Sequence, residues 1–354
     1  MNSDKKICIA LPSLICGGAE RTATLLSNFL VKRGYSVSIL LLFDKPIFYS
    51  LDESIIVIKP QLKRENTNKY LYLLYLPFFI KKSLKALKPD RLFILGYISL
   101  FLISILFVRK NYKVVISNRT NPLRSLFPFY QFIRNKLYKT ADGIIAQTEF
   151  AKRVYEARIK HKSIIVIPNF LREIIHYPAV KENIIITVGR LVPEKGHEYL
   201  MKAFASSDYK DWKLVIVGGG YLETQLNDLI IELNLQGKVD FIGFSTEVDK
   251  WLSKAKLFVM SSQTEGYPNA LIEAMAHDLP CISFDCIAGP AEIINNNVNG
   301  FLIPLNNVQM MSDAISKMIN NNLLRSEIGH NAGNIRVTNE FNQLAIKYEQ
   351  FIFA

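Results

Sequence analysis

Short apolar runs alternate with longer stretches of helical periodicity along the whole chain. The runs are rich in Ile, Val, Leu and Phe at consecutive positions, which is typical of strands buried on both faces of a parallel sheet. After most runs, apolar residues recur every three or four positions, as in an amphipathic helix. The pattern therefore predicts an α/β protein built from repeated strand–helix units.

The alternation falls into two series separated by a polar, proline-containing segment, residues 171–183. Strands are expected at 7–11, 36–43, 55–58, 91–95, 114–117, 143–147 and 164–168, and then at 184–188, 213–217, 239–242, 257–260, 281–284 and 301–304. Helices are expected at 18–33, 70–87 and 97–108, and then at 198–205, 222–233, 247–255, 269–277, 291–295, 307–320 and 343–353.

The 354 residues are more than twice the usual length of one domain, which agrees with two separate cores. We therefore predict two doubly wound, Rossmann-like domains, residues 1–170 and 171–335, that face each other across a cleft at the carboxyl ends of their strands. Residues 336–354 are expected to form a helix that packs back on the first domain.

Charge is distributed unevenly between the two halves. Residues 1–180 contain 29 Lys and Arg against 11 Asp and Glu, whereas the remainder contains 14 against 20. A basic half indicates an anionic partner: nucleic acid, an anionic membrane or a phosphorylated substrate. Cys8, Cys16, Cys281 and Cys286 have no redox or zinc spacing and are expected to be buried thiols of a cytoplasmic protein.

Two cations lie on a short loop after the strand expected at 184–188. Arg190 and Lys195 can neutralise a diphosphate without a metal, Arg as a planar fork and Lys as a point charge. The alternative for this segment alone is a solvated surface loop.

Two carboxylates flank a turn and a helix start in the second half. Glu265 precedes Gly266 and Pro268, which shape the turn, and Glu273 lies one turn into the helix expected to begin at Asn269. The first amides of a helix attract phosphate, so the segment combines an anion site with two groups able to accept from hydroxyls. Taken alone, it is equally compatible with exposed helix acids.

Glycine turns and nearby backbone offer further contacts for a phosphorylated ligand. Gly17 and Gly18 stand at a strand-to-helix turn where an anion can approach bare backbone, although turn glycines are the structural alternative and the loop lacks the dinucleotide fingerprint G-x-G-x-x-G. The backbone at Gly219 and Ile242, at two further strand ends, could contact a nucleobase, with a plain sheet edge as the alternative. The other candidates form the turn and helix start between the two glutamates: Gly266, Tyr267, Pro268, Asn269, Ala270 and Leu271.

As a set, these motifs resemble those of the retaining nucleotide-sugar glycosyltransferases of family 4, which have the GT-B fold, especially bacterial members that build surface polysaccharides or lipid-linked oligosaccharides. The resemblance rests on Gly17-Gly18-Ala19-Glu20-Arg21, Pro168-Asn169, Gly189-Arg190-Leu191, Lys195-Gly196, Gly243, the two-glutamate segment, and Gly289-Pro290 with Glu292.

The resemblance implies that Arg190 and Lys195 hold the donor diphosphate, Glu273 the ribose and Glu265 the transferred sugar, which makes Arg190, Lys195 and Glu265 the catalytic candidates. It also implies transfer of a hexose or N-acetylhexosamine from a UDP-sugar, with a GDP-sugar as second choice, to a lipid-linked glycan acceptor. The chain contains no D-x-D triplet, so we expect no metal and no other cofactor.

One loop departs from the family pattern. Residues 117–122 stand where many relatives carry a histidine or glutamate, and this chain has Asn118 and Arg119 there. We expect Asn118 and Arg119 to contact the acceptor, with contact to the donor phosphate or a purely loop-shaping role as the alternatives for Arg119.

Aromatic residues and lysines alternate at helical spacing in residues 70–87 and 126–139. This pattern is typical of helices that lie in a membrane interface, so we predict peripheral contact with the anionic inner face of the plasma membrane. The alternative is a core-facing helix with a solvated edge. Residues 92–108 are free of charge but are split by Gly96, so no membrane span is predicted.

Two other functions remain open. One is a nucleotide-sugar epimerase of the same fold, whose usual acid–base residues are not evident. The other is a non-catalytic protein that binds an anionic polymer through the basic half. Since no nucleic-acid-binding motif is present, no nucleic acid is expected as a partner.

Overall fold

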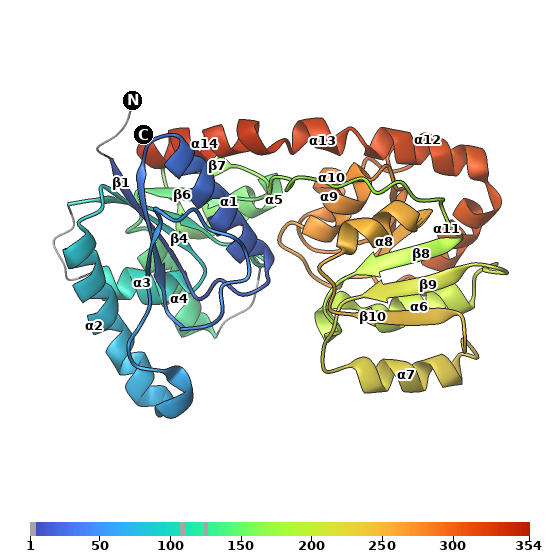
Figure 1. The fold of residues 1–354 in the computed structure, drawn as a ribbon, viewed down its shortest axis with the longest axis horizontal. Coiled ribbons are helices and arrows are strands. Elements are labelled where there is room, and N and C mark those ends of the chain that lie inside the picture. Colours follow the sequence, from blue (N-terminus) through green and yellow to red (C-terminus); the bar gives the residue numbers. More distant parts are fainter. Residues whose placement is uncertain (1–4, 107–110, 124–126) are drawn as a thin grey trace. The chain divides into compact units, whose positions relative to one another are not determined.

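The computed structural model describes residues 5–106, 111–123 and 127–354, and the chain divides into two compact units (Figure 1). Unit 1 comprises Met1–Phe170 and Phe341–Ala354, and unit 2 comprises Leu171–Glu340. The chain thus leaves unit 2 five residues later than expected. The reason is a short helix, α13 (Ile335–Thr338), whose Ile335 lies in the core of unit 2 and whose Arg336 donates to the carbonyl of Ala276 at 2.6 Å.

Unit 1 contains a seven-stranded parallel sheet of order β3-β2-β1-β4-β5-β6-β7. Its strands are β1 (Lys6–Leu11), β2 (Ser36–Leu41), β3 (Ile56–Ile58), β4 (Arg91–Leu95), β5 (Lys113–Ser117), β6 (Gly143–Ala146) and β7 (Ile164–Val166). Its helices are α1 (Gly18–Lys32), α2 (Lys69–Leu87), α3 (Ile98–Ile105), α4 (Pro128–Tyr138), α5 (Glu149–Ile159) and α14 (Phe341–Phe353), with a 3₁₀ turn at Arg64–Asn66.

Alternating residues of β1, an inner strand of this sheet, contribute to two separate cores. Ile7 and Ile9 pack with α1 and α14 on one face of the sheet, and Cys8 and Ala10 pack with α2, α3, α4 and α5 on the other. Because side chains alternate between the faces of a strand, a run of consecutive apolar residues is what a sheet covered on both faces requires.

Unit 2 contains a six-stranded parallel sheet of order β10-β9-β8-β11-β12-β13. Its strands are β8 (Ile184–Val188), β9 (Lys213–Val217), β10 (Val239–Gly243), β11 (Leu257–Met260), β12 (Cys281–Asp285) and β13 (Phe301–Pro304). Its helices, besides α13, are α6 (His197–Ala205), α7 (Glu223–Glu232), α8 (Val248–Lys254), α9 (Asn269–Ala276), α10 (Pro290–Ile293), α11 (Val308–Asn320) and α12 (Asn322–Ala332), with a 3₁₀ turn at Pro193–Lys195. The predicted fold class, two doubly wound α/β domains, is confirmed.

The last helix belongs to unit 1. Leu344, Ala345, Tyr348 and Ile352 of α14 are buried against the face that α1 covers. Glu349 is buried as well and accepts from the hydroxyl of Tyr35 at 2.8 Å.

Several details differ from the sequence expectation. Helices α5, α12 and α13 were not expected. The helix predicted at 97–108 covers Ile98–Ile105, and residues 107–108 lie outside the described part of the chain, as does residue 126 at the start of the second aromatic segment. Cys16 is exposed, whereas Cys8, Cys281 and Cys286 are buried as expected. Within the described ranges, no helix is both long and apolar enough to cross a membrane.

Candidate functional site

The loops that carry the candidate residues of unit 2 lie where the strand order reverses. Strand β8 lies between β9 and β11, and the connections from β8 and β11 leave in opposite directions, which makes the carboxyl ends of these strands the topological switch point where α/β sheets usually bind ligands. The loop 189–196 follows β8, and the segment 261–268 follows β11. Two stretches about 70 residues apart in sequence thereby become neighbours: the amide of Gln263 donates to the carbonyl of Glu194 at 2.8 Å.

Close backbone packing fixes the loop 189–196. The amide of Leu191 donates to the carbonyl of Gly219 at 3.0 Å. A Cβ on Gly218, whose φ is +145°, would lie 2.0 Å from the carbonyl oxygen of Gly189, so only glycine allows this approach. A ring nitrogen of the buried His197 lies 3.0 Å from the carbonyl oxygen of Arg190, and burial lowers the pKa of this histidine. The loop is therefore rigid.

The Arg190 residue itself is exposed at this edge, whereas Lys195 turns toward the segment after β11. The Lys195 Nζ donates to Glu265 Oε1 at 2.6 Å, with 25% of the lysine side chain and 11% of the glutamate side chain exposed. Two residues expected to contact different parts of one donor are thus in direct contact with each other.

Helix α9 begins directly after this segment. The amides of Ala270 and Leu271 lie in its first turn, where a helix supplies no acceptor of its own. The side chain of Leu271 is fully buried, so only its backbone can reach a ligand. The Tyr267 hydroxyl accepts from the Asn339 side chain at 2.8 Å, and burial raises the pKa of this tyrosine to about 12. Tyr267 therefore supports the segment through contacts within unit 2.

Pro268, which precedes α9, is buried. It packs closely against Gly289, since a Cβ on that glycine, whose φ is +105°, would lie 2.5 Å from Pro268 Cδ. Gly266 and Asn269 are partly exposed in the same turn. This part of the two-glutamate segment is thus shaped by buried contacts on one side and is open on the other.

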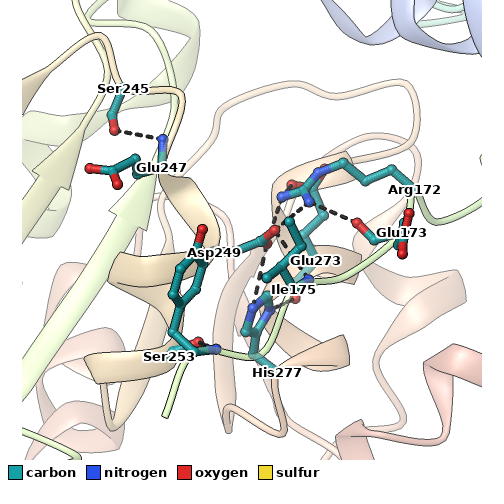
Figure 2. Close-up of polar contacts among 10 residues, drawn as sticks. Arg172, Glu173, Ile175, Ser245, Glu247, Asp249, Ser253, Glu273 and His277 are labelled. Atoms are coloured by element: carbon teal, nitrogen blue, oxygen red, sulfur yellow. Dashed lines mark hydrogen bonds and ion pairs between the residues drawn. The ribbon is translucent and has the colours of Figure 1, made fainter. Parts of the chain in front are cut away.

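Glu273 is held by an arginine that the sequence did not indicate (Figure 2). Arg172 donates through its two terminal nitrogens to the two carboxylate oxygens of Asp249, each at 2.6 Å, and through Nη2 to Glu273 Oε2 at 3.2 Å. Both carboxylates are buried. Burial acts to lower the pKa of Arg172, but the bonds to Asp249 and the charge of Glu273 outweigh it and raise that pKa. The guanidinium is therefore a permanent cation that fixes Glu273.

His277 completes this cluster one turn further along the chain. Its Nδ1 lies 2.9 Å from the carbonyl oxygen of Glu273, and its Nε2 lies 3.4 Å from Asp249 Oδ1 (Figure 2). Burial lowers the pKa of His277, so the ring is neutral at pH 7 and does not add a second cation.

The other donor candidates are spread over two units. Gly219 and Ile242 lie at the carboxyl ends of β9 and β10, and both are partly exposed. Gly17 and Gly18 start α1 and belong to unit 1. Gly17 has extended backbone, with φ at −176°, so its conformation does not itself demand glycine.

Arg119 follows β5 in unit 1 and is bound inside that unit. Its Nη1 donates to Thr22 Oγ1 at 2.8 Å and to Asn169 Oδ1 at 2.6 Å, and its Nη2 donates to the Tyr348 hydroxyl at 2.7 Å. These contacts join three segments of unit 1: helix α1, the residues that follow β7, and helix α14. Asn118 accepts from the Thr120 hydroxyl at 2.9 Å and so closes a local turn. The contacts are those of loop-shaping residues, and acceptor binding by either residue stays a prediction.

The described residues contain no group of three or more His, Cys, Asp or Glu side chains placed to hold a metal ion.

Two tandem doubly wound parallel sheets, with a Lys–Glu pair and a helix start at the switch point of the second, define a two-Rossmann-domain α/β protein. Residues 174–334 match the family described as "Glycosyl transferases group 1", and residues 16–172 match "Glycosyltransferase Family 4".

Individual relatives agree with these matches. A Campylobacter jejuni N-acetylgalactosaminyltransferase named for a diphospho-undecaprenol-linked substrate is 30% identical over 91% of this chain and 92% of its own. An uncharacterized glycosyltransferase of Haemophilus influenzae is 29% identical over 86% and 87%. A crystal structure of S. aureus TarM in complex with UDP and other ligands has a TM-score of 0.83 at 17% identity, covering 99% of this chain and 100% of that one. The chain therefore belongs to the glycosyltransferases of family 4, with the GT-B fold.

Proposed function

We propose that the protein is a retaining, metal-independent glycosyltransferase that moves a hexose or N-acetylhexosamine from a UDP-sugar to a lipid-diphosphate-linked glycan during bacterial polysaccharide biosynthesis. The observation that carries the proposal is the contact between Lys195 and Glu265 at the switch point of unit 2, beside Arg190 and the start of α9. UDP in the TarM structure and the undecaprenol-linked substrate in the name of the Campylobacter relative support the choice of donor and acceptor. A GDP-sugar is the second choice.

The chemistry requires charge stabilisation at the leaving group. The bond between the anomeric carbon and the diphosphate oxygen breaks, the acceptor hydroxyl oxygen bonds to the same carbon from the same face, and its proton passes to a phosphate oxygen of the departing UDP. Arg190, Lys195 and the first amides of α9 would stabilise the charge that develops on the diphosphate. Glu273 would accept from the ribose and Glu265 from the sugar, and no step needs a metal.

Donor binding can be tested by thermal stabilisation with a panel of UDP- and GDP-sugars. A bound ligand at a hundred times its dissociation constant adds about 2.7 kcal/mol to the free energy of unfolding. Lys195→Gln should weaken binding of the best donor at least tenfold, whereas Lys202→Gln on the exposed part of α6 should leave it unchanged. If no nucleotide sugar stabilises the protein, or if both variants bind like the parent, the donor site is wrong.

We also propose that unit 1 supplies the acceptor side and lies against an anionic membrane. Helix α2 exposes Tyr70, Leu74 and Phe78 to the extent of 74%, 67% and 75%, and α4 exposes Phe129 and Phe132. Monomeric soluble proteins rarely expose so many large apolar side chains together, and such patches mark interaction surfaces. The opposite face of α2 buries Tyr72, Leu76 and Ile80 in the core of unit 1, so this helix faces the core on one side, as in the alternative, and exposes apolar side chains on the other.

Vesicle flotation distinguishes membrane contact from simple exposure. Leu74→Ser with Phe78→Ser should abolish flotation with vesicles containing phosphatidylglycerol. Leu323→Ser with Val337→Ser removes two similarly exposed apolar side chains from unit 2 and should leave flotation intact. Equal flotation of all three proteins would remove the membrane assignment without affecting the donor site.

A further inference from the structure

A hollow of about 360 Å³ lies in unit 1 at the end of the sheet opposite Asn118 and Arg119. It is bounded by the last turns of α2, by Asp90 before β4, by Ile105 at the end of α3 and by Tyr112 before β5. Its volume falls within the range of small-ligand pockets, about 300–1,000 Å³. The residues that bound it precede their strands, whereas Asn118 and Arg119 follow β5, so the hollow is separate from the candidate residues of this unit.

Three lysines of one helix line this hollow. Lys81, Lys85 and Lys88 stand at successive turns of α2 and its C-terminal cap. In the part of the chain that the structure describes, none of the three has an ion-pair partner within 4.0 Å. The carboxylate of Asp90 instead accepts from the backbone amide of Lys6 at 2.7 Å. The lysine charges are therefore left for a ligand.

The charges in the hollow favour a monoanion. The lysines contribute three positive charges, and Asp90 contributes one negative charge. The ends of α2 and α3 contribute roughly half a negative charge each, because helix carbonyls point outward there. Among the described residues that line the hollow, the lysine charges thus exceed those of Asp90 and the helix ends by about +1, which matches a phosphodiester.

The surroundings indicate that the phosphodiester carries acyl chains. Leu84, Pro89 and Ile105 give the hollow an apolar wall. At 100° per residue, the exposed Tyr70, Leu74 and Phe78 fall with Lys81 and Lys85 on one stripe of α2 about 80° wide. This stripe is apolar along its first half and cationic along its second half, and the hollow lies beside the cationic half.

From this arrangement we infer that the hollow lined by Lys81, Lys85 and Lys88 binds the phosphodiester headgroup of an anionic phospholipid. The site goes beyond the proposed glycosyl transfer and requires no nucleotide sugar. Binding of the headgroup can therefore be measured on the protein without donor or acceptor.

The test uses monomeric dihexanoyl phosphatidylglycerol, which presents the headgroup and short chains without a bilayer, and records binding by calorimetry. Inorganic phosphate and dihexanoyl phosphatidylcholine serve as the free-anion and zwitterionic probes. The parent should bind phosphatidylglycerol at least ten times more tightly than either probe. Equal binding of inorganic phosphate would overturn the lipid assignment.

The matched variants remove three charges each from unit 1. Lys81→Gln, Lys85→Gln and Lys88→Asn together should weaken phosphatidylglycerol binding at least tenfold. Arg153→Gln, Lys160→Asn and Lys162→Gln together, around the end of α5, should not. Lys88 and Lys160 both cap helices with positive φ, which asparagine tolerates, so the backbone cost is similar. Lys85→Glu alone, which reverses the middle charge, is the second test if the triple variant folds poorly.

If both triple variants lose phosphatidylglycerol binding equally, the overall charge of unit 1 explains the binding, and the proposed site is wrong. If phosphatidylglycerol fails to bind while a nucleotide sugar still stabilises the parent, the headgroup site falls and the proposed transferase function stands.

Discussion

Arg172→Met removes the guanidinium that lies between two buried carboxylates in unit 2. Asp249 and Glu273 are 5% and 6% exposed, and methionine keeps most of the apolar stem while losing the bonds of 2.6, 2.6 and 3.2 Å. Removing one partner of a buried ion pair costs about 3–5 kcal/mol, because a charge remains buried without compensation. Since 22% of the Arg172 side chain is exposed and water can partly replace it, we expect a loss of about 3 kcal/mol.

The pH dependence identifies the cause of that loss. Without Arg172, two buried carboxylates share one cluster with no guanidinium between them. The penalty is largest at high pH and decreases as the pH falls, since a neutral carboxyl is cheaper to bury than a charged one. We expect the deficit to be smaller at pH 5 than at pH 8.

Urea unfolding, monitored by tryptophan fluorescence, measures this loss of stability in unit 2. Both tryptophans of the chain, Trp212 and Trp251, belong to unit 2, so the signal reports on that unit. Lys250→Met is the control, because Lys250 pairs with Glu247 at 3.5 Å on the exposed side of the same helix as Asp249, where such pairs contribute about 0–1 kcal/mol. A deficit below 1 kcal/mol for Arg172→Met, or an equal deficit at both pH values, would refute the reasoning.

Three further predictions follow from the same structure. Gly218→Ala should destabilise unit 2 by more than about 2 kcal/mol, because its Cβ would lie 2.0 Å from a carbonyl oxygen, whereas Gly237→Ala, with φ at +70° and open space around it, should cost about 1 kcal/mol; urea unfolding of both variants checks this. Burial lowers the pKa of His197 and His277 from the ordinary 6.5, so below about pH 7 the unfolded chain takes up protons that the folded chain does not. The free energy of unfolding should therefore decrease as the pH is lowered from 7.5 to 5.5, by no more than about 1.4 kcal/mol per histidine per pH unit. The free energy of unfolding of His277→Gln should decrease less steeply than that of the parent. Transfer activity should survive excess chelator, and a loss that added Mg²⁺ or Mn²⁺ restores would contradict metal-independent catalysis.

Both sheets could be predicted from the sequence because their strands are covered on two faces and therefore read as uninterrupted apolar runs. Helix α12 was missed for a physical reason. It contains Gly329, which lowers helix propensity, but a Cβ at this position would lie 2.4 Å from the carbonyl oxygen of Asp278. The glycine is required by close packing against Asp278, 51 residues earlier, and a local pattern carries no trace of such a contact. Helix α5, in contrast, has a capping Thr148 that could have indicated its start.

The residues of the candidate site likewise fall into two groups, those that the sequence indicates and those that are recognised only from long-range contacts. The resemblance assigned Lys195 and Glu265 to one donor, and the fold explains why they meet, because each follows a strand of the same parallel sheet and these two strands are neighbours. Arg172 could not be recognised, since it lies in what reads as a polar connector and contacts Asp249 and Glu273, 77 and 101 residues away. A long-range partner of this kind leaves no spacing signal in its own segment.

The two glutamates of the motif consequently occupy unlike electrostatic settings. Glu273 accepts from the Arg172 guanidinium, which also donates two hydrogen bonds to Asp249. If this guanidinium turned to another partner, all three buried contacts would break. Glu265 faces a single ammonium on a flexible stem, which three rotatable donors allow to turn toward another anion. Under the proposed function, a diphosphate arriving beside Lys195 competes with Glu265 for that ammonium and leaves the carboxylate to accept from sugar hydroxyls. Binding of the phosphates would then prepare the sugar contact, while the contact assigned to the ribose is fixed in advance.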